Sequence, residues 1–522
     1  MRNIKRPMEK EAGDGMRAGA ALGAAGKVAI GLLALALSGC TGEERTHPER
    51  TDALPISLMV TLHQPSEPSR EMLDIFNRMI GAELQIDWVP SDIYREKLLN
   101  AVETNTLKKV TGVNESDYYL LKNAIRSEMF WEIGPFLDAY PNLSKLDPKV
   151  LRQTAVDGKL YGLYSERWPS RQGLIIRKDW MDKLGLRPPE TTDELYTLLS
   201  RFTKDDPDGN GKADTYGLTD RNDLIYGAFK TFSSYFGTPN NWTLSNGRPQ
   251  PDFMTGAYLD TMDYMKKLYD EGLINRDFAV TSKQIQRYRF LTGQSGVMVG
   301  AMDDAPRLQD ELKRIQPNAE LALVNRIEGP QGFGIWSIPD YSGIFLFSKR
   351  AIPTESELKR ILAVYDRMLE PGPTNFLRYG IQDKHYKVIE GKVAPEPGMN
   401  EDRNANVLPF YSLMIQNISN PGLLRLSDKG QQPLVVLAQR LTDDNGKHLI
   451  RDPMLGLSSP TYDAKGTELS DIITNATYHY ILGQLDRKGF EEQVKLWRQA
   501  GGDKVMEELA QAHAAKPGEA TK

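Results

Sequence analysis

Cysteine and histidine are scarce in this chain. Its 522 residues include one cysteine, Cys40, and six histidines. A single cysteine excludes an intramolecular disulfide, so an exported form of the chain must rely on its core for stability. Six histidines argue against a histidine-rich metal site. A basic excess is also missing, because the formal net charge is −5, and we therefore expect no nucleic-acid-binding surface.

Common catalytic motifs are absent as well. The sequence contains no G-x-S-x-G nucleophile elbow, no H-E-x-x-H zinc motif and no P-loop. It has no internal repeat either. The length predicts about three domains or two large ones, and a hydrophobic fraction of 40% provides ample core. We therefore expect a globular protein that is not an enzyme.

The N-terminus contains an apolar run, Val28 to Leu37, that is too short to span a bilayer as a mature helix. Basic residues precede this run, namely Arg2, Lys5, Arg6, Lys10, Arg17 and Lys27. This order is typical of a signal peptide, which we place at residues 1–39. Met16 is an alternative start.

The apolar run ends in Leu37-Ser38-Gly39-Cys40, which resembles the lipobox of bacterial lipoproteins. The resemblance implies cleavage before Cys40 and a diacylglycerol, a palmitate-type lipid, on its sulfur. We expect an extracytoplasmic protein that is anchored to the outer face of the bacterial cell membrane. Residues 40–53 then form a lipidated tether, and residues 516–522 form a disordered tail.

The stretch from Lys204 to Leu218 has the spacing of a loop that binds one hard cation. Its start matches the EF-hand pattern D-x-[DN]-x-[DN]-G, but the twelfth position is Gly217 and not glutamate. The expected ligands are oxygens of Asp206, Asp208, Asn210, Asp214 and the carbonyl of Lys212. We expect a structural Ca²⁺ here, and the alternative is an Asp/Gly/Asn turn without metal.

Hydrophobic periodicity predicts an α/β protein in which strands and helices alternate, as in a parallel sheet. A capping box at 191–194 is expected to open one helix. The expected strands are 56–62, 84–89, 157–164, 173–176, 295–299, 321–324 and 343–347. The expected helices are 69–80, 92–102, 127–140, 177–184, 191–202, 258–271, 283–291, 355–369, 434–441, 470–482, 489–497 and 502–512.

Several stretches together resemble the family 1 extracellular solute-binding proteins of bacterial ABC importers, in the large lipoprotein branch that includes the alginate-binding proteins. The most specific stretch is DGKLYGLY followed by LIIRKDWMDKLGLRPPETTDELYTLLSRFTKDDPDGNGKADTYGLT. The others are FLTGQSGVMVGAM, YGIQDKHYKVIEGKV and VKLWRQAGGDKVMEELAQ. The segment VETNTLKKVTGVNESDYYLLK, which follows Ala101, departs from the family pattern.

The resemblance implies a two-lobed α/β fold of the type II periplasmic-binding-protein class. Its strands cross twice between the lobes, near Gly158 to Tyr164 and near Ile327 to Pro339, and the ligand cleft lies between the lobes. The implied N-lobe is 54–163 plus 338–378, and the implied C-lobe is 164–337 plus 379–515.

The same resemblance implies a function and a metal. The protein would capture an oligosaccharide, acidic sugars included, and deliver it to the permease subunits of an ABC importer. The protein itself would be a monomer. The alginate-binding relatives hold calcium in the equivalent loop, which carries over to the five positions named above. Those relatives have an acidic residue after the last aspartate, where this chain has Thr215.

Aromatic residues near the expected crossings are candidates for contact with a sugar, because sugars stack their apolar faces on such rings. Arg171 is a candidate for a bidentate contact with the carboxylate of an acidic sugar. The aromatic candidates are Trp168, Trp336, Tyr341, Trp242 and Tyr235. For each of these side chains, packing in the core or exposure to solvent is the alternative.

Two other functions remain open from the sequence. One is a secreted carbohydrate-active enzyme with paired carboxylates, for which the abundance of Asp and Glu is the only support. The other is a glycan sensor or adhesion lipoprotein of the same fold that serves no permease.

Overall fold

The computed structural model describes residues 53–429 and 431–515. The expected signal peptide, Cys40, nearly all of the tether and the tail at 516–522 lie outside the described residues. Among the residues described, no helix is both long and apolar enough to cross a bilayer. The described chain is α/β, as the periodicity predicted.

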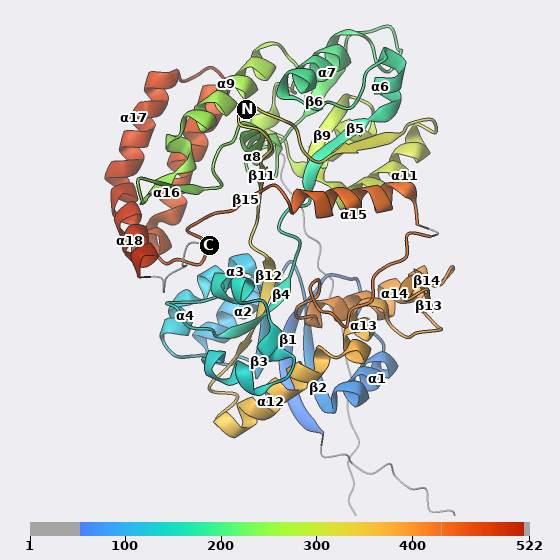
Figure 1. Ribbon diagram of the computed structural model, residues 1–522, viewed down its shortest axis with the longest axis vertical. Helices are drawn as coiled ribbons and strands as arrows, with labels where there is room; N and C mark the ends of the chain where they lie inside the picture. The colour runs from blue at the N-terminus through green and yellow to red at the C-terminus, as the bar shows by residue number, and fades with distance from the viewer. Residues whose placement is uncertain (1–52, 430, 516–522) are drawn as a thin grey trace, which may run out of the picture. The chain divides into compact units, whose positions relative to one another are not determined.

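The first of two large sheets has five strands in the order β2-β1-β3-β12-β4 (Figure 1). β1, β2 and β3 run parallel to one another, and β12 is antiparallel to both β3 and β4. The strands are β1 Leu54–Leu62, β2 Ala82–Pro90, β3 Val110–Asn114, β4 Gly162–Glu166 and β12 Tyr341–Phe347. We call this sheet and the elements packed on its core the first lobe.

Helices and one hairpin complete the first lobe. The helices are α1 Arg70–Ile80, α2 Tyr94–Glu103, α3 Glu115–Leu120, α4 Lys122–Arg126, α5 Pro148–Gln153, α12 Glu355–Met368, α13 Pro371–Tyr379 and α14 Asn400–Asn406. The hairpin joins β13 Tyr386–Ile389 to β14 Lys392–Pro395. Gly112 shows why small residues are needed in this core, since an added Cβ would lie 3.0 Å from the Phe345 ring.

The second sheet has four strands in the order β10-β5-β9-β6, and we call it and its helices the second lobe. Its strands are β5 Gln172–Arg177, β6 Tyr216–Thr219, β9 Ser295–Ala301 and β10 Leu321–Val324. β6 runs parallel to β9, whereas β5 is antiparallel to β9 and β10. Trp180 and Phe202 pack edge to face beneath Gly296, where any side chain would collide with both rings.

The helices of the second lobe include the three C-terminal ones, α16 to α18, with α16 packed on α9 (Figure 1). They are α6 Lys178–Leu184, α7 Thr192–Lys204, α8 Ala228–Tyr235, α9 Gly256–Asp270, α10 Lys283–Leu291, α11 Ala305–Ile315, α15 Pro433–Asn445, α16 Pro460–Ile481, α17 Arg487–Trp497 and α18 Asp503–Ala514. Two short strand pairs are also present: β7 Trp242–Ser245 with β8 Arg248–Pro251, and β11 Ile335–Trp336 with β15 Leu449–Ile450.

Local sequence signals account for several helix boundaries. The Thr191 hydroxyl accepts a hydrogen bond from the backbone N–H of Glu194 at 3.2 Å, which confirms the predicted cap of α7. The Glu194 carboxylate reaches back one residue further than a standard capping box, to the N–H of Glu190 at 2.7 Å. The predicted helix at 127–140 is wrong. Phe130 instead pairs with Ser348 in a β-bridge, and only a 3₁₀ turn at Gly134–Ala139 follows.

The chain passes between the two lobes three times. The first passage is the segment 167–171, between β4 and β5. It lies later in the chain than the predicted crossing at 158–164, because β4 still belongs to the first sheet. The second passage, between β10 and β12, coincides with the expected one. A third passage precedes α15, which packs on α11 in the second lobe.

The third passage arises because residues after 378 still pack in the first lobe. The Phe410 ring lies 5.8 Å from the Phe76 ring of α1 and 5.5 Å from the Phe376 ring of α13. Val407, Leu413 and Met414 are buried in the same core. The sequence analysis assigned this stretch to the C-lobe, whereas its apolar side chains are buried against α1 and α13.

Candidate ligand-binding site

Carboxyl ends of parallel strands in both lobes lead into the segments near the first passage. In open α/β sheets, ligands bind outside such ends. β3 ends at Asn114 and is followed by Glu115 and α3, whereas β6 ends at Thr219 and leads to Tyr226. The first passage itself lies between β4 of one sheet and β5 of the other. We therefore place the candidate ligand-binding site where these segments meet.

Two arginines of the first passage make ion pairs with the two lobes. The Arg167 guanidinium pairs with the Glu115 carboxylate at the start of α3, and its Nε donates to the Pro339 carbonyl at 3.0 Å. Arg171 Nη1 lies 2.6 Å from Asp303 Oδ2, just after β9. Burial raises the pKa of Glu115, and the charge of Arg167 opposes that shift. The site thus contains fixed charges of both signs.

Tyr226 is an aromatic side chain beside the charged groups of Arg167, Glu115 and Arg171. Its ring is 41% exposed and lies 5.8 Å from the ring of Trp336 in an edge-on arrangement. Burial of its hydroxyl raises the pKa of Tyr226, and Arg167, Glu115 and Arg171 lie close enough for their charges to act on that pKa. An aromatic face of the second lobe is therefore held beside charged groups of the first passage and of α3.

Two further tyrosines are exposed nearby, Tyr119 on α3 and Tyr462 on α16. Burial and, after it, the charge of Asp452 raise the pKa of Tyr462. Burial and, less strongly, the charges of Glu115 and Asp452 raise the pKa of Tyr119. The sequence analysis missed Tyr119, Tyr226 and Tyr462. Tyr119 lies in the segment that departs from the family pattern, and no motif distinguishes the other two from ordinary surface tyrosines.

The structure places the predicted aromatic residues differently. Trp336 is only 4% exposed, and its Nε1 donates to the Thr231 hydroxyl at 3.1 Å, so it supports Tyr226 from below. Tyr341 is buried within the first sheet, and Tyr235 is buried in the second core beside Phe232. These three side chains have no accessible face for a sugar in this structure. Trp168 is half-buried in the first passage, near the site, and Trp242 is half-buried on β7.

A hydrogen-bonded loop holds Tyr226 in place. Asp223 Oδ1 accepts from the N–H groups of Ile225 and Tyr226 at 3.1 and 2.9 Å. Arg221 Nη2 donates to the Tyr226 carbonyl at 2.6 Å, and its Nη1 donates to Gln286 Oε1 at 2.9 Å. Below them, buried Asp220 accepts from the N–H of Ala228, the first residue of α8, at 2.9 Å. The backbone on both sides of Tyr226 is therefore fixed before any ligand arrives.

The predicted cation loop follows α7, as expected, and is closed by Asp206. Its carboxylate accepts from the N–H groups of Gly209, Asn210 and Gly211 at 3.0 to 3.1 Å. The Asn210 amide donates to Asp208 at 2.9 Å and to Asp214 at 3.1 Å. Within the described part of the chain, no three or more His, Cys, Asp or Glu side chains are grouped as a metal site. The side-chain oxygens of Asp206, Asp208, Asn210 and Asp214 lie in one loop and are of the donor type that Ca²⁺ prefers.

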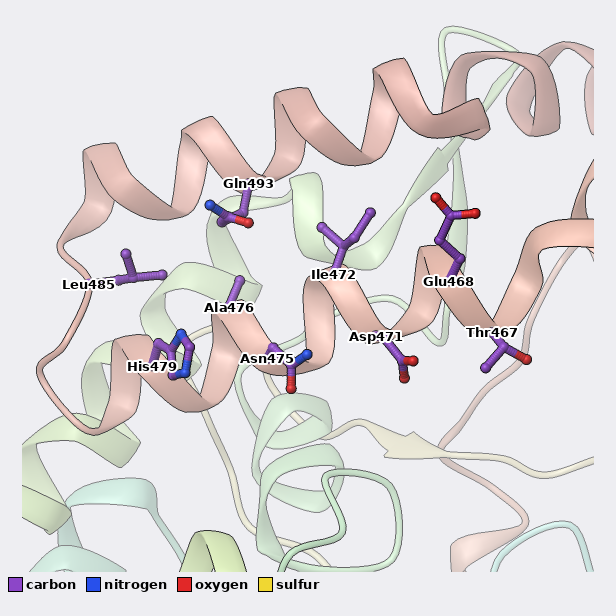
Figure 2. A pocket seen from close by; sticks show the side chains of 9 residues that line it. All are labelled: Thr467, Glu468, Asp471, Ile472, Asn475, Ala476, His479, Leu485 and Gln493. Atoms are coloured by element: carbon purple, nitrogen blue, oxygen red, sulfur yellow. The ribbon is translucent and has the colours of Figure 1, made fainter.

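Two hollows have linings that include none of Tyr119, Tyr226 and Tyr462. One, of about 730 Å³, runs between α16 and α17, where Figure 2 shows Glu468 and Ile472 directed from α16 toward α17 and Gln493 on the facing helix. The other, of about 480 Å³, is lined by Trp242, Phe333, Arg451 and their neighbours. Of the predicted site residues, Trp242 lines the second hollow, and neither Trp168 nor Arg171 does.

The family comparison agrees with the resemblance seen in the sequence. Residues 65–325 match the family described as bacterial extracellular solute-binding protein. The polygalacturonan/rhamnogalacturonan-binding protein YtcQ of Bacillus subtilis (strain 168) is 39% identical over 482 residues, which is 91% of this chain and 95% of that protein. Lipoprotein LipO of the same organism is 30% identical over 490 residues, 92% of this chain and 97% of that protein.

Solved structures share the fold at low sequence identity. A solute-binding protein of Bifidobacterium longum infantis ATCC 15697, described as binding HMO and associated with an ABC transporter, has a TM-score of 0.71 at 17% identity, covering 88% of this chain and 99% of that one. The alginate-binding protein AlgQ2 without calcium ion has a TM-score of 0.64 at 17% identity, covering 89% and 99%. The fold is therefore the two-lobed type II periplasmic solute-binding fold.

The loop under Tyr226 generates a prediction about pH. Burial raises the pKa of Asp220 from an ordinary value of 3.8 to about 7, with Arg221, Asp223 and Tyr478 nearby. The folded protein then binds the proton more tightly than the unfolded chain does, so this group should make stability fall as pH rises from about 4 to about 7. Asp220→Asn keeps an acceptor for Ala228 and should flatten that fall.

Urea unfolding at several pH values between 4 and 8 measures the effect. Asp260→Asn is the matched control, because Asp260 is an exposed residue of α9. It should leave the pH dependence of the unfolding free energy as in the unmodified protein. An equal pH dependence in the Asp220→Asn variant would contradict the assignment.

Proposed function

Because the chain belongs to the bacterial extracellular solute-binding protein family, we propose that it binds an acidic, galacturonate-containing oligosaccharide between its lobes. The protein, which acts as a monomer, then delivers that sugar to the permease of an ABC importer. This is a family of binding proteins and not of enzymes, as the sequence analysis expected. The observation that carries the proposal is the 39% identity, over nearly the whole of both chains, to a protein named for polygalacturonan and rhamnogalacturonan binding.

The side chains of the candidate site suit this chemistry. Tyr119, Tyr226 and Tyr462 offer exposed rings for the apolar faces of sugars and hydroxyls for their polar edges. Arg171 is part-exposed, and its hydrogen bond to Asp303 uses only one of its five N–H donors. The remaining donors are available for a sugar carboxylate. Trp168, in the same passage, is the predicted aromatic residue that stays a candidate for this site.

Replacement of Tyr226 tests the proposed site. Tyr226→Ala removes a ring that is already held in place, so galacturonate oligomers should bind more weakly by roughly 1–3 kcal/mol, about 5- to 150-fold in Kd. Titration calorimetry of residues 41–522 with oligogalacturonates measures this, and the sugar should be recovered intact. Tyr288→Ala is the control, because Tyr288 is an exposed tyrosine on α10.

Two results would count against the proposal. Absence of binding by any pectin-derived oligomer, in a protein that unfolds cooperatively, would remove the acidic-sugar assignment. Equal affinity in the Tyr226→Ala variant and the unmodified protein would place the sugar elsewhere on the molecule.

We also propose that Cys40 carries the lipid that keeps the protein at the membrane. The support is the sequence from Leu37 to Cys40 after an apolar run and the name of the relative lipoprotein LipO. Cys40→Ser should therefore move most of the protein from the membrane fraction to the soluble fraction of a bacterial expression host. An unchanged distribution between the two fractions would contradict lipid anchoring at this residue.

The loop from Asp206 to Asp214 is the proposed calcium site. Asp206, Asp208, Asn210, Asp214 and the Lys212 carbonyl would hold the ion, whose charge would replace the amide hydrogen bonds that now link the carboxylates. Gly209 and Gly211 have positive φ angles of 79° and 78°, which lets the loop turn back on itself. The ion would serve as a structural clip at the end of α7.

Calcium should raise the melting temperature of the protein, because an ion that binds only the folded state stabilises it by mass action. Differential scanning calorimetry after chelation and after calcium addition measures the shift. Asp208→Asn keeps the shape of the side chain but removes its charge, and should reduce the shift. A melting temperature that calcium leaves unchanged would contradict the site.

A further inference from the structure

The smaller of the two hollows described above is open to solvent and lies beside the second passage of the chain between the lobes. Its volume of about 480 Å³ falls in the range of small-ligand sites. Its walls come from β7, from the loop before β11 and from the residues after β15. We call it the β7 hollow and define it by Trp242, Thr243, Leu244, Gln331, Phe333 and Arg451.

The β7 hollow exposes large apolar side chains that are nevertheless held in place. Phe333 is 42% exposed, and the Arg326 guanidinium lies 4.3 Å from the centre of its ring. The His448 ring lies 5.7 Å from the Phe333 ring. Trp242 packs against a small core that contains Met454 and Trp497. Exposed aromatic surface that is gathered in a cavity and fixed in position is typical of a binding site.

Polar groups accompany this aromatic surface. The side chains of Gln331 and Thr243 line the hollow, and neither side chain makes a hydrogen bond to another residue within 53–429 and 431–515. Arg451 Nη1 and Nη2 donate to the two carboxylate oxygens of Asp340 at 2.6 and 3.3 Å, yet the Arg451 side chain is 51% exposed. Its unused N–H donors give the hollow a cationic partner for an anion.

These features match the chemistry of one kind of ligand. A sugar ring needs an apolar surface for its C–H face, amide or hydroxyl groups for its hydroxyls and, where it is a uronate, a guanidinium for its carboxylate. We propose that the β7 hollow is a second carbohydrate site, which takes one or two uronate units. This inference rests on the proposed function for the class of ligand, but it concerns a different set of residues.

The lining of the β7 hollow includes none of the tyrosines Tyr119, Tyr226 and Tyr462 of the candidate site. Trp336 of β11 directs its indole to Tyr226 and Thr231. The residues that line the β7 hollow include Phe333 and Gly334, which precede that strand, and Ile450 of its partner β15. A ligand in the hollow would therefore contact Phe333, Gly334 and Ile450, beside the strand pair β11–β15.

Calorimetric titration with digalacturonic acid tests the second site. We expect two binding events per chain in the unmodified protein. Phe333→Ala should weaken one of them at least 10-fold and leave the other, whereas Tyr226→Ala should do the reverse. Ile315→Ala, which removes an exposed apolar side chain of α11, is the matched control and should retain both.

The outcomes separate this inference from the proposed function. One binding event that Tyr226→Ala weakens and Phe333→Ala leaves unchanged would overturn the second site while the proposed function stands. No binding event in the unmodified protein would overturn both. Gln331→Ala provides an independent test, because it leaves the aromatic walls in place and should weaken the same event as Phe333→Ala; its failure to do so would also count against the second site.

Discussion

The Arg167 guanidinium joins parts of the chain that lie far apart in sequence. It pairs with Glu115 at the start of α3, and its Nε donates to the carbonyl of Pro339 in the second passage. The backbone N–H of Arg167 also donates to the backbone carbonyl of Asp340 at 2.9 Å. Because both members of the pair are partly buried, loss of either would leave a charge without its partner, which is costly. The positions of α3, of the first passage and of the second passage are therefore coupled through Arg167.

Tyr226 lies in the same region and packs against Trp336, and the two rings have different roles. The tryptophan is buried and hydrogen-bonded to Thr231, so it acts as a rigid support. The tyrosine above it keeps an exposed face, and Asp223 and Arg221 hold its backbone. A ring that is fixed before binding loses little conformational entropy when a ligand arrives. The exposed aromatic surface of this site thus comes from tyrosine, and the tryptophan supplies the packing beneath it.

The sequence predicts the alternation of helices and strands well where periodicity is strong. Helix 283–291 and strand 321–324 agree with α10 and β10 at both ends. The predicted helix at 127–140 fails because its apolar residues are buried by a β-bridge at Phe130 and by a 3₁₀ turn, which local periodicity does not distinguish from a helix. The site was harder to predict, since aromatic type says nothing about burial. Trp336, Tyr235 and Tyr341 satisfied the sequence criteria, but tertiary packing buries all three.

The charges around the proposed sites bear on release as well as capture. Arg167, Arg171 and Arg451 are each paired with a carboxylate, namely Glu115, Asp303 and Asp340. A sugar carboxylate would have to share or exchange these partners, so part of its attraction to the guanidinium is offset by the bond it displaces. On release of such a sugar, the internal ion pair would form again and no bare cation would remain. If the ligand is the acidic sugar proposed above, paired arginines would attract its carboxylate and would still permit its release to a permease.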